Sequence, residues 1–434
     1  MLKTVMRHSF ILAIGAALGR LFPYAFILWS STTLAHLQYN TVSAIFMWST
    51  VAATLVATGI STVMAQRIAR ESDSQTSLSL VANHYLLILL ATSAFSLLTF
   101  FYGFEASQFL FHQSVQPGLY EPATLAGWAW PQVMFFVTVL NATRRGKAAA
   151  LLIAVGGVLQ GAGMFIGSQM TSADSTAITW GFAIGSTCAV CVGAIIVKQV
   201  LFKDIGVYKI FRLLDFRSIR GSRSSMLFNT LASSAVMPVG FLAGSLIAKS
   251  KNGVSELAQY YFLEQISQLI IYFPALAGQV LMPYVSRHLH EISTDQKIKL
   301  IRSSCRKIFL LFLICTVLSI LLGFIVEPVI RIIHSNHLGI EAVWATRWML
   351  YNATLTLPLT VLGALLIGAG HIKFGSLTNV VWGACVLTGT QLLVDFGNAG
   401  FQASRVVASL MVLMLGVSFL LFTNSSTSMV RSAR

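Results

Sequence analysis

The chain has 434 residues, of which 56% are hydrophobic and only 10% are charged, and its mean hydropathy is +0.76. A water-soluble domain carries about 25% charged residues, so this composition excludes a soluble globular protein and predicts a membrane protein. About 20 apolar residues cross a bilayer, so the length allows roughly a dozen spanning helices and leaves no room for a large soluble domain.

Stretches without charged residues mark most of the spans. The 46 residues from Leu21 to Gln66 lack charge but are too long for one span, and the polar segment Gln38–Thr41 divides them. The sequence thus predicts an all-α polytopic membrane protein with its first helix retained. In chain order, the twelve predicted helices cover residues 8–32, 42–65, 78–101, 124–142, 148–169, 177–199, 224–248, 258–284, 308–328, 348–369, 374–394 and 402–423.

The orientation follows from the distribution of lysine and arginine, because positively charged short loops stay in the cytoplasm. With both termini inside, 23 of the 29 basic residues fall on the inner side, four fall on the outer side, and Arg20 and Arg405 lie within spans. The net charge of +15 is thus explained by basic residues spread over the inner loops of a membrane protein. Nucleic acid is therefore not an expected partner. The predicted location is a cytoplasmic (inner) membrane with both termini cytoplasmic.

The longest inner loop divides the chain into two halves of six helices. We predict an N-lobe over residues 1–205, a basic cytoplasmic loop over 206–223 and a C-lobe over 224–434. The halves resemble each other: Pro23, Gln38-Tyr39 and Arg67 in the first half are echoed by Pro238, Gln259-Tyr260 and Arg287 in the second. Six helices return the chain to the same face, so the halves are predicted to be parallel repeats, a transporter architecture.

Four segments carry a family resemblance. Residues 256–261 (ELAQYY) and 273–287 (FPALAGQVLMPYVSR) resemble the eighth-helix signature of the polysaccharide (O-antigen-type) flippases of the multidrug/oligosaccharidyl-lipid/polysaccharide exporter superfamily. Residues 58–70 (TGISTVMAQRIAR) resemble the end of the second helix of that family, and residues 368–373 (GAGHIK) fit the turn between its helices 10 and 11. The span count, the six-plus-six division and the basic inner loops fit as well.

The resemblance implies a V-shaped pair of six-helix lobes around a cavity that opens to each membrane face in turn. The implied cargo is an undecaprenyl-diphosphate-linked oligosaccharide, such as an O-antigen repeat for lipopolysaccharide, moved from the inner to the outer leaflet of a bacterial membrane. Polysaccharide polymerase and assembly proteins are the partners that this pathway would involve. The alternative within the superfamily is a multidrug exporter, but helix 1 carries Arg20 and no carboxylate to attract a cationic drug.

Arg20 is the most informative charged residue. It lies about 12 residues from each end of its predicted helix, too deep for its side chain to reach the interface, so it is expected to face protein or water. A guanidinium matches diphosphate oxygens bidentately and keeps its charge, which favours a phosphate clamp. The alternative is a structural arginine bound to helix carbonyls or to Glu264.

The early turns of helix 8 hold three polar residues. Glu264 is a candidate coupling residue, since a buried carboxylate can take up a proton; the alternatives are an ion pair with Arg20 or a hydrated acid near the surface. Gln265 and Gln268 are candidates for binding sugar hydroxyls, with Gln268 one turn from Glu264 on the same face. Glutamines also serve as interhelical hydrogen-bonding residues.

Four further residues complete the candidate site. His84 is either a proton relay or an interfacial histidine near the inner side. Arg405, in the first turn of helix 12, either pairs with Asp395 or makes a second phosphate contact. Pro23 and Pro238 remove backbone hydrogen bonds, so both helices are expected to kink during alternation.

Several chemistries have no signature in the chain. The longest outer loop, 102–123, holds two glutamates and no lysine or arginine, which argues against a membrane enzyme. No nucleotide-binding loop, metal-ligand cluster or nucleophile–base pair appears, so neither a cofactor nor a metal is expected. Helices 7 and 11 lack central carboxylates for sodium, although Asn229 and Asn379 offer neutral oxygens.

Overall fold

The computed structural model describes residues 2–71, 73–111, 116, 119–170, 174–203, 223–250, 252–332 and 342–432. These residues form helices and no strand, which confirms the predicted all-α class. Of the predicted inter-lobe loop 206–223, all but Arg223 lies outside the described residues. The elements are α1 (Leu2–Thr33), α2 (His36–Ala52), η1 (Ala53–Thr58), α3 (Gly59–Arg70), α4 (Ser74–Phe111), α5 (Tyr120–Ala142), α6 (Gly146–Met170), α7 (Ser175–Leu201), α10 (Arg223–Ser234), α11 (Met237–Ala248), α12 (Gly253–Glu291), α13 (Thr294–Ile332), α14 (Val343–Gly368), α15 (Ile372–Leu392), η4 (Val394–Phe396) and α16 (Gly397–Ser432).

Each predicted span corresponds to one helical segment of the described chain. The second span is formed by α2, the π-helical turn η1 and α3 in direct succession, and the seventh is formed by α10 and α11. Nine of the described helical segments are long and apolar enough to cross a membrane. The three segments below that threshold are α10–α11, α12 and α15, and all three line the cavity described below.

Several helices run well beyond the predicted spans, so the predicted loops were too long. The helix α4 continues to Phe111 instead of ending at residue 101, because residues 102–111 are mostly apolar or aromatic and contain no proline. The helix α13 begins at Thr294 instead of residue 308, and its first turns carry the basic residues that were assigned to an inner loop. Charge marks where a helix leaves the hydrocarbon, but a helix does not have to end there.

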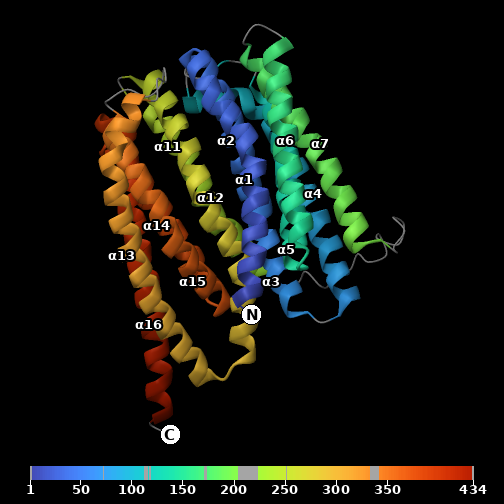
Figure 1. Cartoon of the computed structure of the whole chain (residues 1–434), viewed down its shortest axis with the longest axis vertical. Coiled ribbons are helices and arrows are strands. Elements are labelled where there is room, and N and C mark those ends of the chain that lie inside the picture. The colour runs from blue at the N-terminus through green and yellow to red at the C-terminus, as the bar shows by residue number, and fades with distance from the viewer. Residues whose placement is uncertain are drawn as a thin grey trace.

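The described helices gather in two groups (Figure 1). Helices of the first half (α1 to α7) lie on one side of the molecule, where α6 packs against α1 and α7. In the second half, α14 packs against α12, α13 and α16. The two groups meet where α12 packs against α1, α2 and α3, and where α10 packs against α3 and η1. The exact lobe limits, 1–205 and 224–434, stay a prediction.

The echoed tyrosines lie on helices that pack against one another at this junction. Tyr39 on α2 and Tyr260 on α12 are both fully buried. The echoed prolines differ in their local structure: Pro23 lies inside the uninterrupted α1, whereas Pro238 is the second residue of α11, directly after the break that separates α10 from α11. A proline in the first helical turn loses no intrahelical hydrogen bond, so Pro238 marks a helix start.

Glycines bring α1 and α6 into direct backbone contact. A Cβ atom on Gly15 would lie 2.5 Å from the carbonyl oxygen of Ala150, and one on Gly157 would collide with the carbonyl group of Gly19. Helices in membranes associate largely through such close packing, because lipid offers no hydrophobic driving force for their association.

This packing predicts the effect of one added methyl group. The Gly157→Ala variant should lower the apparent melting temperature in detergent, because overpacking should reduce the free energy of unfolding by about 1–3 kcal/mol. Gly363→Ala is the matched control, because nothing lies within 4 Å of a Cβ atom at that helical position. Equal melting temperatures for the two variants, measured by tryptophan fluorescence, would contradict the backbone contact.

Candidate functional site

A cavity of about 260 Å³ lies among the helices of the second half. Its walls come from α10, α11, α12, α14, α15 and α16, and Met47 of α2 is the first-half residue that lines it. The cavity is therefore built by the second lobe and touches the junction between the two halves.

The helix α12 presents three polar residues to this region at successive helical turns. Tyr260, Glu264 and Gln268 are spaced four residues apart, so their side chains share one face of the helix. The Tyr260 hydroxyl donates a hydrogen bond of 2.6 Å to the carbonyl oxygen of Gly240 on α11. The Gln268 Nε2 donates one of 2.7 Å to Glu264 Oε1. The first bond ties this face of α12 to α11, and the second orients the carboxylate of Glu264.

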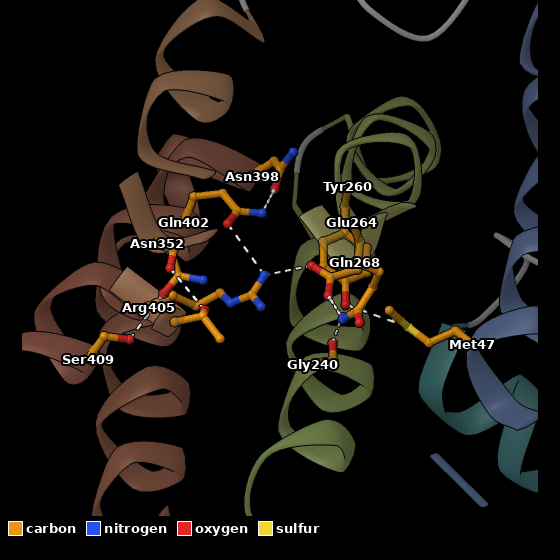
Figure 2. Close-up of polar contacts among 11 residues, drawn as sticks. Met47, Gly240, Tyr260, Glu264, Gln268, Asn352, Asn398, Gln402, Arg405 and Ser409 are labelled. Atoms are coloured by element: carbon orange, nitrogen blue, oxygen red, sulfur yellow. Dashed lines mark hydrogen bonds and ion pairs between the residues drawn. The ribbon is translucent and has the colours of Figure 1, made fainter. Parts of the chain in front are cut away.

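The helix α16 presents a matching row of polar side chains. Asn398, Gln402, Arg405 and Ser409 are spaced four, three and four residues apart and follow one face of the helix. Arg405 Nη1 donates a hydrogen bond of 2.5 Å to Glu264 Oε2 and lies 3.5 Å from Gln402 Oε1. Figure 2 shows this contact, with Arg405 reaching from α16 to Glu264 on α12.

Contacts at the start of α16 align the polar side chains of α16 with those of α12. Gly397 has a φ of +52°, a left-handed conformation that favours glycine, and it turns the chain into α16. The next backbone N–H, of Asn398, donates to Glu256 Oε2 at 3.1 Å, and the Asn398 side chain donates to Gln259 Oε1 at 3.4 Å. These contacts join the beginnings of α12 and α16, so Glu264 and Arg405 meet further along the two helices.

The ion pair is deeply buried, with 4% of Glu264 and 8% of Arg405 exposed. Each carboxylate oxygen of Glu264 accepts one hydrogen bond, from Arg405 and from Gln268. Burying two charges costs several kcal/mol per ion, and only close pairing with further hydrogen bonds offsets this cost. Each member of the pair therefore depends on the other to remain charged inside the protein.

A second set of hydrogen-bonded polar side chains lies on the part of the cavity wall formed by α14, α15 and α16. Ser409 Oγ donates a hydrogen bond of 3.0 Å to Asn352 Oδ1 on α14, and Trp382 Nε1 on α15 donates one of 3.1 Å to the same hydroxyl. These bonds tie α14, α15 and α16 together around the cavity.

The remaining polar lining is uncharged. Among the described residues of the cavity wall, Glu264 and Arg405 are the only charged ones, and they neutralise each other. No group of three His, Cys, Asp or Glu side chains that could hold a metal ion occurs in the described part of the chain. The uncharged polar residues of the wall are Asn229, Gln268, Asn352, Thr356, Ser376, Thr378, Asn379, Trp382 and Ser409.

The structure brings three predicted site residues together: Glu264, Gln268 and Arg405. Two predicted pairings are wrong. Arg405 binds Glu264 and not Asp395, because α16 begins at Gly397 and carries Arg405 to its third turn. Glu264 binds Arg405 and Gln268, so it is not the partner of Arg20.

Arg20 lies in the first half, away from this cavity wall. Its guanidinium carbon is 5.4 Å from the ring centre of Trp130 on α5 and 5.5 Å from that of Tyr24 on α1. Its Nη1 lies 3.5 Å from the Tyr24 hydroxyl, and the residue is half-buried. Stacking on two aromatic rings stabilises a cation inside a membrane protein.

Gln265 and His84 are buried without lining the cavity. Gln265 is 2% exposed and follows Glu264, so it points to a different face of α12. His84 is fully buried in the third turn of α4, where its Nδ1 lies 2.7 Å from the Leu80 carbonyl oxygen. The helix α4 begins at Ser74, earlier than expected, and this turn packs against the protein, while the interfacial depth of His84 stays a prediction.

Sequence reasoning did not find Asn352, Trp382, Asn398 or Ser409. The spacing of polar residues on α16 was available as a signal, but the predicted start of that helix at residue 402 hid its first member. The low hydropathy of α12 and α15 was a second signal, because a helix that lines a polar cavity carries fewer apolar residues.

Comparisons with known proteins identify the fold. No family model matches the chain, and no curated protein matches its sequence. A solved MOP-superfamily transporter from Pyrococcus furiosus, described as having a binding pocket of reverse polarity, is 16% identical, covers 98% of this chain and 96% of its own, and has a TM-score of 0.69. A multidrug resistance MATE-family transporter in an inward-facing conformation is 15% identical, with coverages of 96% and 98% and a TM-score of 0.68. An outward-facing one is 15% identical, with coverages of 98% and 96% and a TM-score of 0.65.

These likenesses extend over nearly the whole chain, so the protein has the fold of MATE transporters of the MOP superfamily. The fold agrees with the one implied by the sequence resemblance, and these likenesses do not distinguish the O-antigen flippase branch from the others.

The buried ion pair predicts a characteristic pattern of stabilities. Glu264→Gln and Arg405→Gln should each lower the free energy of unfolding by about 3–5 kcal/mol, because each leaves one buried charge without its partner. The double variant removes both charges and should lose less than either single variant. Unfolding in detergent measures all three, and a double variant whose loss equals the sum of the single losses would contradict the pair.

Proposed function

We propose that the protein is an alternating-access flippase that moves an undecaprenyl-diphosphate-linked oligosaccharide from the inner to the outer leaflet of a bacterial cytoplasmic membrane. The observation that carries this proposal is the chemistry of the cavity wall, in which the single carboxylate of the described lining is bound by Arg405 and the other polar groups are amides, hydroxyls and an indole. The transporter fold over nearly the whole chain supports the same conclusion.

Neutral amides and hydroxyls are suited to sugars. A sugar hydroxyl both donates and accepts hydrogen bonds, and asparagine and glutamine side chains offer both functions. Asn379 lines the cavity, and none of the described residues forms a side-chain hydrogen bond with it, so its amide is available to a ligand. Asn229, Thr356 and Ser376 add further hydrogen-bonding groups on neighbouring helices.

The size of the cavity requires a conformational change. Pockets for drug-sized ligands have volumes of about 300–1,000 Å³, and the cavity of about 260 Å³ is smaller than that. A glycan with its lipid carrier therefore enters only when the helices around the cavity move apart. Multidrug MATE transporters of the same fold are known in inward-facing and outward-facing conformations.

The diphosphate of the carrier needs cationic contacts. Arg20 is our candidate on the first lobe, since its charge is permanent and held on the aromatic rings of Tyr24 and Trp130. Arg405 is the candidate on the second lobe. Protonation of Glu264 would release Arg405 toward a phosphate, which makes Glu264 the proposed coupling residue.

A multidrug exporter is the second candidate, because structural neighbours are described as multidrug resistance transporters. A cationic drug is attracted by a free carboxylate in a low-dielectric cavity. Here the cavity carboxylate is already paired with Arg405, which favours the glycan over the drug.

The proposal predicts that a neutral amide of the cavity wall is required for transport. Asn379→Leu should reduce the rate of lipid-linked glycan movement about tenfold, because loss of one or two hydrogen bonds to the sugar costs about 1.4 kcal/mol. Movement is measured in proteoliposomes with an imposed proton or sodium gradient. Gln169→Leu is the matched control, since Gln169 is exposed on α6 and should keep the wild-type rate.

Two results would contradict the proposal. A wild-type protein that moves no lipid-linked glycan under any gradient but confers drug resistance on overexpression would favour the exporter. An Asn379→Leu variant that keeps the wild-type rate would remove the cavity from the transport path.

A further inference from the structure

A second groove, with a volume of about 380 Å³, lies on the outside of the second lobe between α13 and α14. Its α13 side includes Ser319, Gly323 and Phe324, and its α14 side includes Trp344, Arg347 and Tyr351. None of these residues lines the central cavity, so the groove is separate from the proposed transport site.

The groove opens toward the surface that faces lipid. The helix α13 is apolar and only 17% of its spanning window is buried within the protein. Phe324 on α13 and Trp344 on α14 are 72% and 61% exposed. In a membrane, exposed apolar side chains of this kind contact lipid chains, so lipid occupies the space around the groove.

Arg347 is an exceptional residue in this position. Its Nε donates a hydrogen bond of 3.1 Å to the carbonyl oxygen of Gly323 on the opposite wall, and its guanidinium carbon lies 5.0 Å from the ring centre of Trp344. These two contacts hold the guanidinium in the groove. No carboxylate in the described part of the chain pairs with it, and Glu327, one turn past Gly323, does not line the groove.

An arginine has five N–H donors, and the contact with Gly323 uses only one of them. A charged group at a lipid-facing position is costly unless an anion or water compensates it. The ligand that satisfies both requirements carries phosphate oxygens, which accept two parallel hydrogen bonds from a guanidinium.

The surroundings of Arg347 fit a lipid better than a free phosphate. Tryptophan and tyrosine are enriched where membrane headgroups begin, and Trp344, Trp348 and Tyr351 lie in the first turns of α14. Apolar side chains such as Ile320 and Phe324 continue the groove beyond the cation and can lie along an acyl chain. Charge complementarity and shape therefore select one occupant, a phospholipid with net negative charge.

The geometry points to a binding site for an anionic glycerophospholipid, with its phosphate on Arg347 and one acyl chain along α13. The sequence assigns the start of α14 to the outer side of the membrane, so the lipid comes from the outer leaflet. This site does not depend on which cargo the central cavity carries.

Binding of two phospholipids to the full-length protein in detergent tests this site. Native mass spectrometry should show that the wild type retains phosphatidylglycerol about tenfold more strongly than phosphatidylcholine, the difference expected for one charge-assisted contact. Arg347→Gln should abolish the preference. Lys249→Gln is the matched control, because Lys249 is another outer-side cation near an aromatic ring, Phe109, and it lies outside the groove.

A second variant keeps the charge and removes the space. Gly323→Leu places a side chain next to Arg347, whose Cγ would lie 3.8 Å from the new Cβ, and it should also abolish the preference. Melting temperatures confirm that each variant is folded. A wild type without preference, a preference that survives in both groove variants, or its loss in Lys249→Gln would overturn the assignment.

Discussion

The buried ion pair between Glu264 and Arg405 is the contact on which the chemistry of the second lobe depends. It joins α12, which packs against the first half, to α16, which packs within the second half. Because either charge alone in the protein interior is costly, the pair holds these helices together and cancels the charge of the cavity. The remaining polar side chains of the wall are uncharged hydrogen-bonding groups, which supports the proposed glycan cargo.

We propose that the pair also links the cavity to conformational change. The helix α12 contacts α1, α2 and α3 of the first half, so a movement of α12 relative to α16 is transmitted to the junction of the lobes. Asn398 and its contacts with Glu256 and Gln259 hold the beginnings of α12 and α16 together. In the proposed mechanism, release of Arg405 from Glu264 leaves these contacts in place, so the two helices separate further along their length.

Much of the fold could be predicted from the sequence, because backbone groups in lipid must be satisfied within helices and charged residues are excluded from spans. Helix ends were less predictable, since charge reports the edge of the hydrocarbon and not the end of the helix. The same error placed Arg405 in the first turn and paired it with Asp395, its neighbour in the sequence. Glu264 and Gln268 were found because their partnership follows from helical spacing, whereas the Asn352–Ser409 contact joins distant segments.

The binding of a lipophilic cation tests most directly whether the Glu264–Arg405 pair determines what the cavity accepts. Tetraphenylphosphonium binding is measured by equilibrium dialysis with wild type, Glu264→Gln, Arg405→Gln and the Glu264→Gln/Arg405→Gln double variant, each in detergent. The account predicts no saturable binding to the wild type or the double variant, and binding to Arg405→Gln, in which the bound cation takes the place of Arg405 as the partner that keeps Glu264 charged. Saturable binding to the wild type that Glu264→Gln abolishes would show a free carboxylate and contradict the account.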